Sequence, residues 1–432
     1  MFRVMLKDKH GTPFTLAKPR AYLSEKALAR RRRQNIAVDS TDLPVNPAYV
    51  KAIRRIGVDV VSQSKWNNTV LVRGTDIRQL RSVDALGCVA GIKLVWTSPD
   101  SINKPSYRLK YHKEFNRWDT ISQNRYGVTR EQVEMIGGVK MHDHGFRGRG
   151  MTVAVLDGGF MNADLIPSLK NADVAGWRDF VVPASSTVFK EMDHGTKVLS
   201  TMAVDVPYTF VGTSPEATFW LLRCEDNLTE SLAEEDFWAA AAEFADSVGV
   251  DIISSSLGFH AFDNPDDNYD YRQLDGHTAL ISRTASMLAG KGIVLVNSAG
   301  NDGMAAWKKI NVPADATDII TVGAVTPERR NAAFSSVGPT ADGRVKPDVM
   351  ALGSPTSVIT GRGTIIKDVG TSFSTPLVAG MVACLWQALP GKTAKDIIRL
   401  VLDSCDNTAA PDNIYGYGVP DFWRAYERGM KN

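Results

Sequence analysis

The stretch MTVAVLD at residues 151–157 decides the fold of most of this chain. It is short, rich in β-branched residues and apolar without polar alternation, a pattern typical of a strand buried on both faces. The same pattern recurs in four later stretches: ATFWLLRC (217–224), VDIISSSL (250–257), GIVLVNSA (292–299) and DIITVGAV (318–325). Helical stretches at 231–249 and 277–292 separate successive strands, so the sequence predicts a doubly wound α/β fold with a mostly parallel sheet.

Residues 1–98 show a different pattern, in which short strands and helices alternate. In chain order the pattern predicts a strand at 1–8, helices at 23–34 and 46–57, two strands within 58–74, a helix at 75–83 and a strand at 89–96. This is typical of a small α+β unit with an antiparallel sheet. Residues 99–125 are polar, basic and poor in aliphatic side chains, as in an exposed linker. The sequence therefore predicts three parts: 1–98, 99–125 and 126–432.

Charge is divided unevenly between these parts. Residues 1–125 hold 24 Lys and Arg against 10 Asp and Glu, a net charge of +14, whereas residues 126–432 hold 26 against 38, a net charge of −12. Such a division indicates either a nucleic-acid-binding arm or a basic segment that docks on an acidic domain, and we favour docking. The run Arg30–Arg33 is the feature most typical of nucleic-acid binding, but it also fits the solvated face of a short helix.

Composition excludes several classes of protein. The chain is 44 % hydrophobic and 23 % charged, as in ordinary soluble proteins. No stretch approaches the roughly 18 apolar residues of a membrane helix, and the N-terminus lacks the apolar segment of a signal peptide. The four cysteines, at 88, 224, 384 and 405, have no CxxC or Cys/His spacing, so no zinc site is expected. Cys384 and Cys405 are compatible with a disulfide or with buried free thiols.

Polar residues follow three of the predicted strands. Asp157 ends the first, Ser256 lies near the end of a later one, and Asn301 follows the next. In an open parallel sheet, ligands bind outside the carboxyl ends of the strands. Any one of these residues alone fits an ordinary turn, but three on one edge predict a functional site.

Two further polar residues lie at predicted helix starts. His194 opens a helix in the sequence DHGT (193–196), and Ser372 precedes the apolar helix LVAGMVACLWQAL, with Pro376 expected in the first turn. A serine there lies near the positive end of the helix dipole, where backbone N–H groups can stabilise an oxyanion. Taken separately, each residue also fits a simple helix cap.

At these residues the chain resembles the subtilisin-like protease (subtilase) family. AVLDGG (154–159), DHGTKV (193–198) and GTSFSTPLVAG (370–380) resemble its Asp, His and Ser motifs. SLG (256–258) is similar to the segment that binds substrate backbone and the P1 side chain, and SAGN (298–301) to the oxyanion loop. These elements occur in the family's order, and the resemblance covers about residues 126–430.

The resemblance implies a serine endopeptidase that acts through an acyl-enzyme. Ser372, rather than Ser374, would be the nucleophile, His194 the acid–base group, Asp157 its orienting partner and Asn301 an oxyanion donor. It also implies substrate-binding residues: Ser256, Leu257, Gly258, Ala299, Gly300 and, near the base of the S1 pocket, Asn311. No acidic cluster is evident in these segments, so we expect a broad or moderately apolar preference.

Three positions beside these motifs depart from the family. Gly158 stands where many relatives have Ser or Thr, Asp193 stands where Gly is usual, and Lys197 replaces the commoner His or Pro-like residues after HGT. We expect Asp193 to raise the pKa of His194 and Lys197 to offset part of that effect. None of these departures removes a catalytic group, so we expect an active enzyme.

The family also carries expectations for the rest of the protein. Residues 1–98 resemble a prodomain that inhibits the enzyme until the linker at 99–125 is cut, so we expect a zymogen that is secreted or periplasmic. Protein or peptide substrates are expected, and neither a nucleic acid nor a membrane span. Catalysis needs no cofactor. The acidic loop 263–270 could hold a structural Ca²⁺, although a solvated turn is favoured.

Two alternative functions remain open at this point. A non-catalytic, peptide-binding pseudoprotease would carry the same motifs. An α/β-hydrolase esterase would need G-x-S-x-G and the chain order Ser, acid, His, whereas the order here is Asp, His, Ser.

Overall fold

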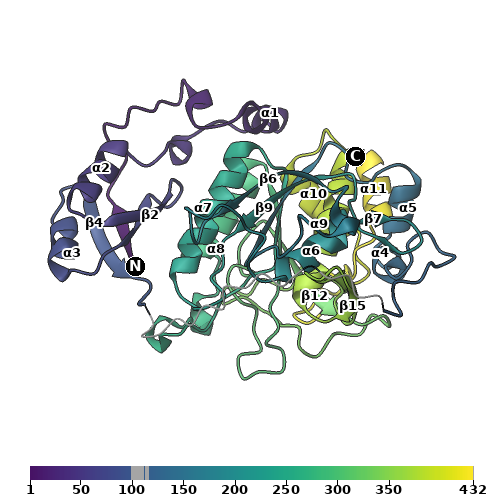
Figure 1. The fold of residues 1–432 in the computed structure, drawn as a ribbon. Helices are drawn as coiled ribbons and strands as arrows, with labels where there is room; N and C mark the ends of the chain where they lie inside the picture. The colour runs from purple at the N-terminus through teal and green to yellow at the C-terminus, as the bar shows by residue number, and fades with distance from the viewer. Residues whose placement is uncertain (99–110, 112–115, 432) are drawn as a thin grey trace.

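A seven-stranded parallel sheet forms the centre of the larger part of the protein, seen in a computed structural model that describes residues 1–98, 111 and 116–431 (Figure 1). The strand order is β13-β12-β11-β10-β5-β9-β6. The strands are β5 (Thr152–Asp157), β6 (Asp173–Asp179), β9 (Thr218–Arg223), β10 (Ile252–Ser255), β11 (Val294–Ser298), β12 (Ile320–Val325) and β13 (Val349–Leu352). The predicted doubly wound α/β fold is confirmed.

Helices cover both faces of this sheet. Val153 and Val155 of β5 pack into the hydrophobic cluster that contains α9, whereas Ala154 and Leu156 pack into the cluster that contains α7. Burial on both faces explains the continuous apolar strands. The helices are α4 (Arg130–Glu134), α5 (Gly138–Asp143), α6 (His194–Ala203), α7 (Ala233–Val248), α8 (Leu280–Met287), α9 (Thr371–Ala388), α10 (Ala394–Asp403) and α11 (Phe422–Lys431).

Two hairpins complete the domain: β7 (Asp205–Val206) with β8 (Phe210–Val211), and β14 (Thr356–Ile359) with β15 (Ile365–Asp368).

Two strands of the large sheet and one helix boundary differ from the sequence-based prediction. Strands β6 and β13 lie at the two edges of the sheet; β6 is largely exposed and β13 has only four residues, so neither shows a long apolar run. Helix α9 begins at Thr371, which puts Pro376 inside the helix and not in its first turn. Ser372 is therefore the second residue of the helix.

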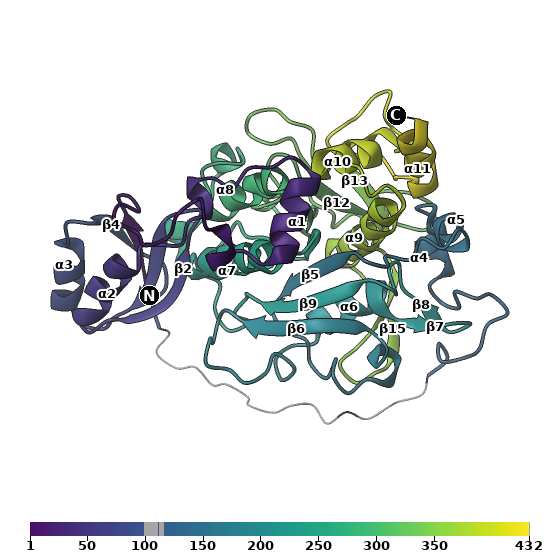
Figure 2. The ribbon, with the colours of Figure 1, turned by 90° about the horizontal axis from the view of Figure 1, so that it is seen from above.

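The N-terminal part is a separate α+β unit whose antiparallel sheet has the order β2-β3-β1-β4. Its elements are β1 (Phe2–Leu6), α1 (Glu25–Arg33), α2 (Pro47–Arg55), β2 (Asp59–Ser64), β3 (Thr69–Arg73), α3 (Ile77–Asp84) and β4 (Val89–Leu94). All of these were predicted from the alternating pattern. Figures 1 and 2 show the unit, in purple and blue, beside helices α7 and α8.

Ion pairs join this unit to α7. Arg31 Nη2 lies 2.9 Å from Asp246 Oδ1, Arg30 pairs with the same carboxylate, and Lys65 Nζ lies 3.3 Å from Asp246 Oδ2. Arg30 and Arg31 are each only 1 % exposed. They are thus buried in a docking surface, whereas Arg32 and Arg33 of the same run are exposed. Farther along α7, Arg3 pairs with Asp236 at 2.7 Å.

Candidate active site

Three neighbouring strands bring the predicted catalytic residues to one edge of the sheet. Strands β5, β10 and β11 are adjacent and parallel, so their carboxyl ends lie side by side. Asp157 is the last residue of β5, Ser256 directly follows β10, and Asn301 lies three residues beyond β11. This is the arrangement expected from the sequence.

Asp157 and His194 form a hydrogen-bonded pair at this edge. His194 is the first residue of α6, and its Nδ1 lies 2.9 Å from Oδ2 and 3.0 Å from Oδ1 of Asp157. The Gly158 N–H also donates to Asp157 Oδ1, at 2.8 Å. Asp157 is fully buried while the His194 side chain is 27 % exposed. The carboxylate therefore fixes Nδ1 as the inner nitrogen and leaves Nε2 without this partner.

Charges around His194 favour its protonated form. Burial alone would lower the pKa of His194, but the charge and hydrogen bond of Asp157 and the charge of Glu225 raise it to about 9. Lys197 acts in the opposite direction, as expected. The second carboxylate that acts on the histidine is thus Glu225. Asp193 instead accepts the Gly361 N–H at 2.9 Å and lies 3.8 Å from Lys197 Nζ.

Ser372 is held in the first turn of α9 by contacts with Ser256. A proline has no N–H, so Pro376 cannot donate to the carbonyl four residues earlier, which belongs to Ser372. The Ser256 hydroxyl donates to that carbonyl instead, at 2.9 Å, and the Ser372 hydroxyl lies 3.4 Å from the Ser256 carbonyl oxygen. The Phe373 ring contacts His194, with centroids 5.8 Å apart. Ser256 therefore holds Ser372 at the start of α9, and the next residue along the helix contacts His194.

Asn301 lies across from the start of α9. Its side-chain oxygen accepts both the backbone N–H and the hydroxyl of Thr371, each at 2.9 Å. With the oxygen held in this way, the side-chain amide N–H₂ is left to donate elsewhere. The Ser372 N–H is also free of an intrahelical partner, because it lies in the first turn. These two donors can converge on one oxyanion.

The residues expected to bind substrate come together beside this site. Leu257 is buried, and Gly258 lies against Asn311. The Asn311 N–H donates to the carbonyl of Ala299 at 3.1 Å. Gly300 has a φ of +110°, a conformation that favours glycine.

Comparisons with known proteins identify the family of this chain. The subtilase family model matches residues 148–418, more than half of the chain. The chain belongs to the subtilase family. The model of the peptidase S8 propeptide domain from Bacteroidota matches residues 1–112, which include the whole N-terminal unit. The protein is a subtilisin-like serine protease with a propeptide domain.

Several curated proteins are similar to this subtilase. Subtilisin NAT from Bacillus subtilis subsp. natto is 28 % identical over 289 residues, which cover 66 % of this chain and 68 % of that protein. Serine protease AprX from Bacillus subtilis (strain 168) is 28 % identical over 303 residues, 63 % of this chain and 65 % of AprX. Subtilisin-like protease SBT6.1 from Arabidopsis thaliana is 27 % identical over 313 residues, 68 % of this chain and 27 % of that protein.

Glu225 is a residue of this subtilase's site that sequence reasoning missed. It lies two residues beyond β9, the strand next to β5, and burial and the charge of Asp157 raise its pKa to about 7. A Cβ on Gly158 would lie 2.5 Å from Glu225 Oε2 and 2.5 Å from Asn227 Oδ1. The missing side chain at 158 therefore makes room for these groups. A fourth strand end, after ATFWLLRC, was the signal that could have revealed Glu225.

The end of the propeptide sheet approaches this edge of the subtilase domain. The Trp96 indole N–H donates to the Thr229 hydroxyl at 3.0 Å, and the Ala233 N–H donates to the carbonyl of Val95 at 3.2 Å. Thr229 and Ala233 belong to the segment that runs from Glu225 into α7. The propeptide thus contacts the loop that carries a residue of the site.

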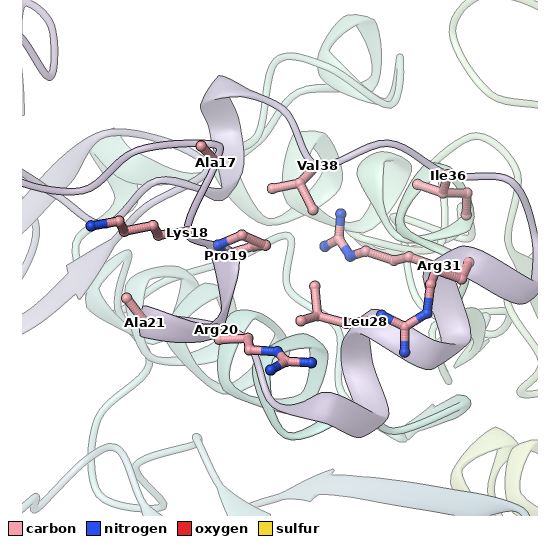
Figure 3. A pocket seen from close by; sticks show the side chains of 10 residues that line it. Ala17, Lys18, Pro19, Arg20, Ala21, Leu28, Arg31, Ile36 and Val38 are labelled. Atoms are coloured by element: carbon pink, nitrogen blue, oxygen red, sulfur yellow. The ribbon is translucent and has the colours of Figure 1, made fainter.

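A pocket of about 500 Å³ lies within the propeptide domain and is separate from the active site (Figure 3). Its lining comes from residues 17–21 and from Leu28, Arg31, Arg32, Ile36 and Val38. None of these belongs to the catalytic edge of the sheet.

The remaining expectations concern metal and disulfide sites. In the loop 263–270, Asn264 and Asp270 cap short helical turns and Asp267 pairs with Lys93 at 3.8 Å. No cluster of three or more His, Cys, Asp or Glu side chains that could hold a metal ion is found in the described part of the chain. Cys384 and Cys405 are buried free thiols. No helix among the described residues is both long and apolar enough to cross a membrane.

Proposed function

We propose that this subtilase hydrolyses peptide bonds with Asp157, His194 and Ser372 as its triad and Asn301 as an oxyanion donor. The observation that carries the proposal is the Asp157–His194 hydrogen bond at the carboxyl edge of the sheet, beside the first turn of α9. A buried carboxylate, a histidine and a helix-start serine are the groups that acyl transfer needs.

The chemical steps follow from these positions. His194 Nε2 takes the proton from Ser372 Oγ as the oxygen attacks the scissile carbonyl, and Asp157 stabilises the imidazolium that forms. The Asn301 amide and the Ser372 N–H stabilise the oxyanion. His194 then protonates the leaving amine. In the second half of the reaction it takes a proton from the water that attacks the acyl-enzyme and gives that proton to Ser372 Oγ as the ester bond breaks. No cofactor takes part.

Self-processing of the full chain provides the test. We expect the purified wild-type chain to cut itself and then to be labelled at Ser372 by a serine-directed phosphonate. The Ser372→Ala chain should stay intact and unlabelled, whereas Ser374→Ala should behave as wild type. A wild-type chain that is neither labelled nor active after removal of its N-terminal part would instead indicate a peptide-binding pseudoprotease.

We also propose that the propeptide, residues 1–98, inhibits the catalytic domain, 126–432, until the segment 99–125 is cut. The docking contacts with α7 and the opposite net charges support this proposal. Most of 99–125 lies outside the described residues. N-terminal sequencing of active protein tests the boundary; an intact Met1 in fully active enzyme would contradict it.

We also propose that the protein is secreted or periplasmic, because an inhibitory propeptide can keep a protease inactive until it has been exported. Fractionation of the source cells, with activity assayed in the medium, periplasm and cytosol, tests this location. Activity confined to the cytosol would contradict it.

A further inference from the structure

We propose that the Asn311 side chain closes the S1 slot of this subtilase, so that the enzyme cleaves after small residues such as Gly, Ala and Ser. The inference rests on the proposed function, because the slot receives a P1 side chain only if Ser372 is the nucleophile.

Two backbone segments form the walls of the slot. Residues 256–258 follow β10 and residues 299–301 follow the neighbouring strand β11. Ser256 contacts the carbonyl of Ser372, and Asn301 contacts Thr371, so the near ends of both walls lie at the reacting centre. A P1 side chain must then extend between the two walls, away from the serine.

Asn311 already occupies the space between these walls. A Cβ placed on Gly258 would lie 3.0 Å from the Asn311 Cβ, and a Cβ placed on Gly300 would lie 2.9 Å from Asn311 Nδ2. The side chain therefore lies against both glycines at once. Gly258 and Gly300 have no side chains, but this does not make the slot deeper, because the Asn311 side chain fills the space beside them.

Hydrogen bonds hold the Asn311 side chain in this place. Its Nδ2 donates to Asp302 Oδ2 at 2.8 Å, and its Oδ1 accepts the indole N–H of Trp307 at 3.1 Å. The His260 ring stacks on Trp307, with centroids 4.8 Å apart and planes 10° apart. Asn311 is only 7 % exposed. A large P1 side chain would have to break both hydrogen bonds to displace it, so the slot stays closed.

The charge beside Asn311 further restricts which P1 side chains the slot accepts. Asp302 places a carboxylate against the Asn311 amide, 3.8 Å from His260 Nδ1. An acidic P1 side chain would meet a like charge there, which disfavours it. The slot therefore suits small, uncharged side chains.

A series of peptides that differ only at P1 tests the inference on the full chain after self-processing. We expect kcat/KM for Ala, Ser or Gly to exceed that for Leu or Phe by about tenfold or more. Asn311→Gly removes the obstruction and should raise kcat/KM for Leu and Phe by about tenfold, with Ala little changed. Asn171→Gly makes the same chemical change at an exposed position and should keep the wild-type order.

The chain's own processing site gives a second measurement that needs no variant. The segment 99–125 contains both small and large residues, so N-terminal sequencing separates the two outcomes. We expect cleavage after a small residue, of which the segment offers Ser101, Ser106, Thr120 and Ser122. Large alternatives are Tyr107, Leu109, Tyr111 and Phe115.

Faster cleavage after Leu or Phe than after Ala by the wild-type enzyme would overturn the inference, even if Asn311→Gly failed to fold. That result would leave the proposed function standing. Absence of cleavage of every peptide, together with no labelling of Ser372, would count against the proposed function itself.

Discussion

At the residue scale, two carboxylates act on His194, and under the proposed function they set the pH at which the enzyme works. Only the neutral imidazole can take the serine proton, and the pKa of His194 is raised to about 9. Below that pH the neutral fraction falls tenfold per unit. We therefore expect kcat/KM to rise tenfold per pH unit up to about pH 9, as measured with a neutral peptide. A plateau already reached at pH 7 would contradict this.

The contribution of Glu225 can be separated from that of Asp157. Glu225 has a pKa of about 7, so its carboxylate is charged between pH 7 and 9 and favours the imidazolium there. Glu225→Gln should lower the pKa of His194, move the acid limb of kcat/KM to lower pH and increase activity at pH 7–8. Activity on the plateau, at pH values above the pKa of His194, should be unchanged. Glu230→Gln is the matched control, since that pKa is also about 7 and Glu230 is not a main influence on His194. Equal shifts in both variants would exclude a specific role for Glu225.

Ser256 is expected to stabilise the position of the nucleophile. Ser256→Ala leaves the Ser372 carbonyl without its donor, and an unsatisfied buried carbonyl costs about 1–3 kcal/mol. Unfolding in denaturant, measured in a Ser372→Ala background to prevent autolysis, should show this loss in the free energy of unfolding. Ser254 is equally buried, but its hydroxyl has no partner among the described residues, so Ser254→Ala should cost little. Equal losses in the two variants would contradict the argument.

Sequence reasoning placed the main residues of the site but not the contacts between them. Asp157, Ser256 and Asn301 were recognisable because each polar residue follows an apolar strand. Glu225 also follows an apolar strand, but its proximity to Gly158 is a contact between residues 67 positions apart in the sequence, and that contact was missed. The hydrogen bond that the Ser256 hydroxyl donates to the Ser372 carbonyl, in place of the N–H that Pro376 lacks, is also a contact between distant segments.

At the element scale, the C-terminal end of α7 depends on the propeptide. Asp246 lies in the last turn, where the helix dipole disfavours a negative charge. Burial alone would raise the pKa of Asp246, but Arg30, Lys65 and Arg31 hold it below its usual value. The cations that stabilise this end of the helix thus come from the propeptide.

Breaking this cluster should speed release of the propeptide. Asp246→Asn leaves two buried arginines without their shared carboxylate, and removing one partner of a buried pair costs about 3–5 kcal/mol. We expect active enzyme to appear earlier after self-processing, with the rate of cutting followed separately on gels. Asp267→Asn, which breaks the half-exposed pair with Lys93, should have little effect. Unchanged release in Asp246→Asn would show that the cluster does not hold the propeptide.

Helices and strands were predicted correctly where their burial produces a recognisable pattern of apolar residues in the sequence, and were missed where it does not. The five central strands of the large sheet are apolar because both faces are covered, and the propeptide strands have clear turns between them. Strand β6 lies at a sheet edge and carries exposed polar residues, so its sequence resembles a loop. The start of α9 was placed too late because Pro376 was taken to mark the first turn.

At the scale of the whole molecule, two oppositely charged parts are held together. The net charge is +14 for residues 1–125 and −12 for residues 126–432. Salt shortens the range of such attraction, since the Debye length falls from about 10 Å at 0.1 M to about 3 Å at 1 M. We expect the active fraction of diluted, self-processed protein to increase with NaCl concentration. An active fraction that does not change with salt would show that the charge division is irrelevant to docking.

The absence of a side chain at Gly158 has a consequence for how relatives of this protein can differ. A side chain at 158 and the present positions of Glu225 and Asn227 exclude one another, because the two oxygens already occupy its place. Positions 158 and 225 should therefore covary: a relative with Ser or Thr after the aspartate should carry a shorter residue at 225. Whether a relative has glycine at position 158 would then also affect the pH at which that enzyme is active.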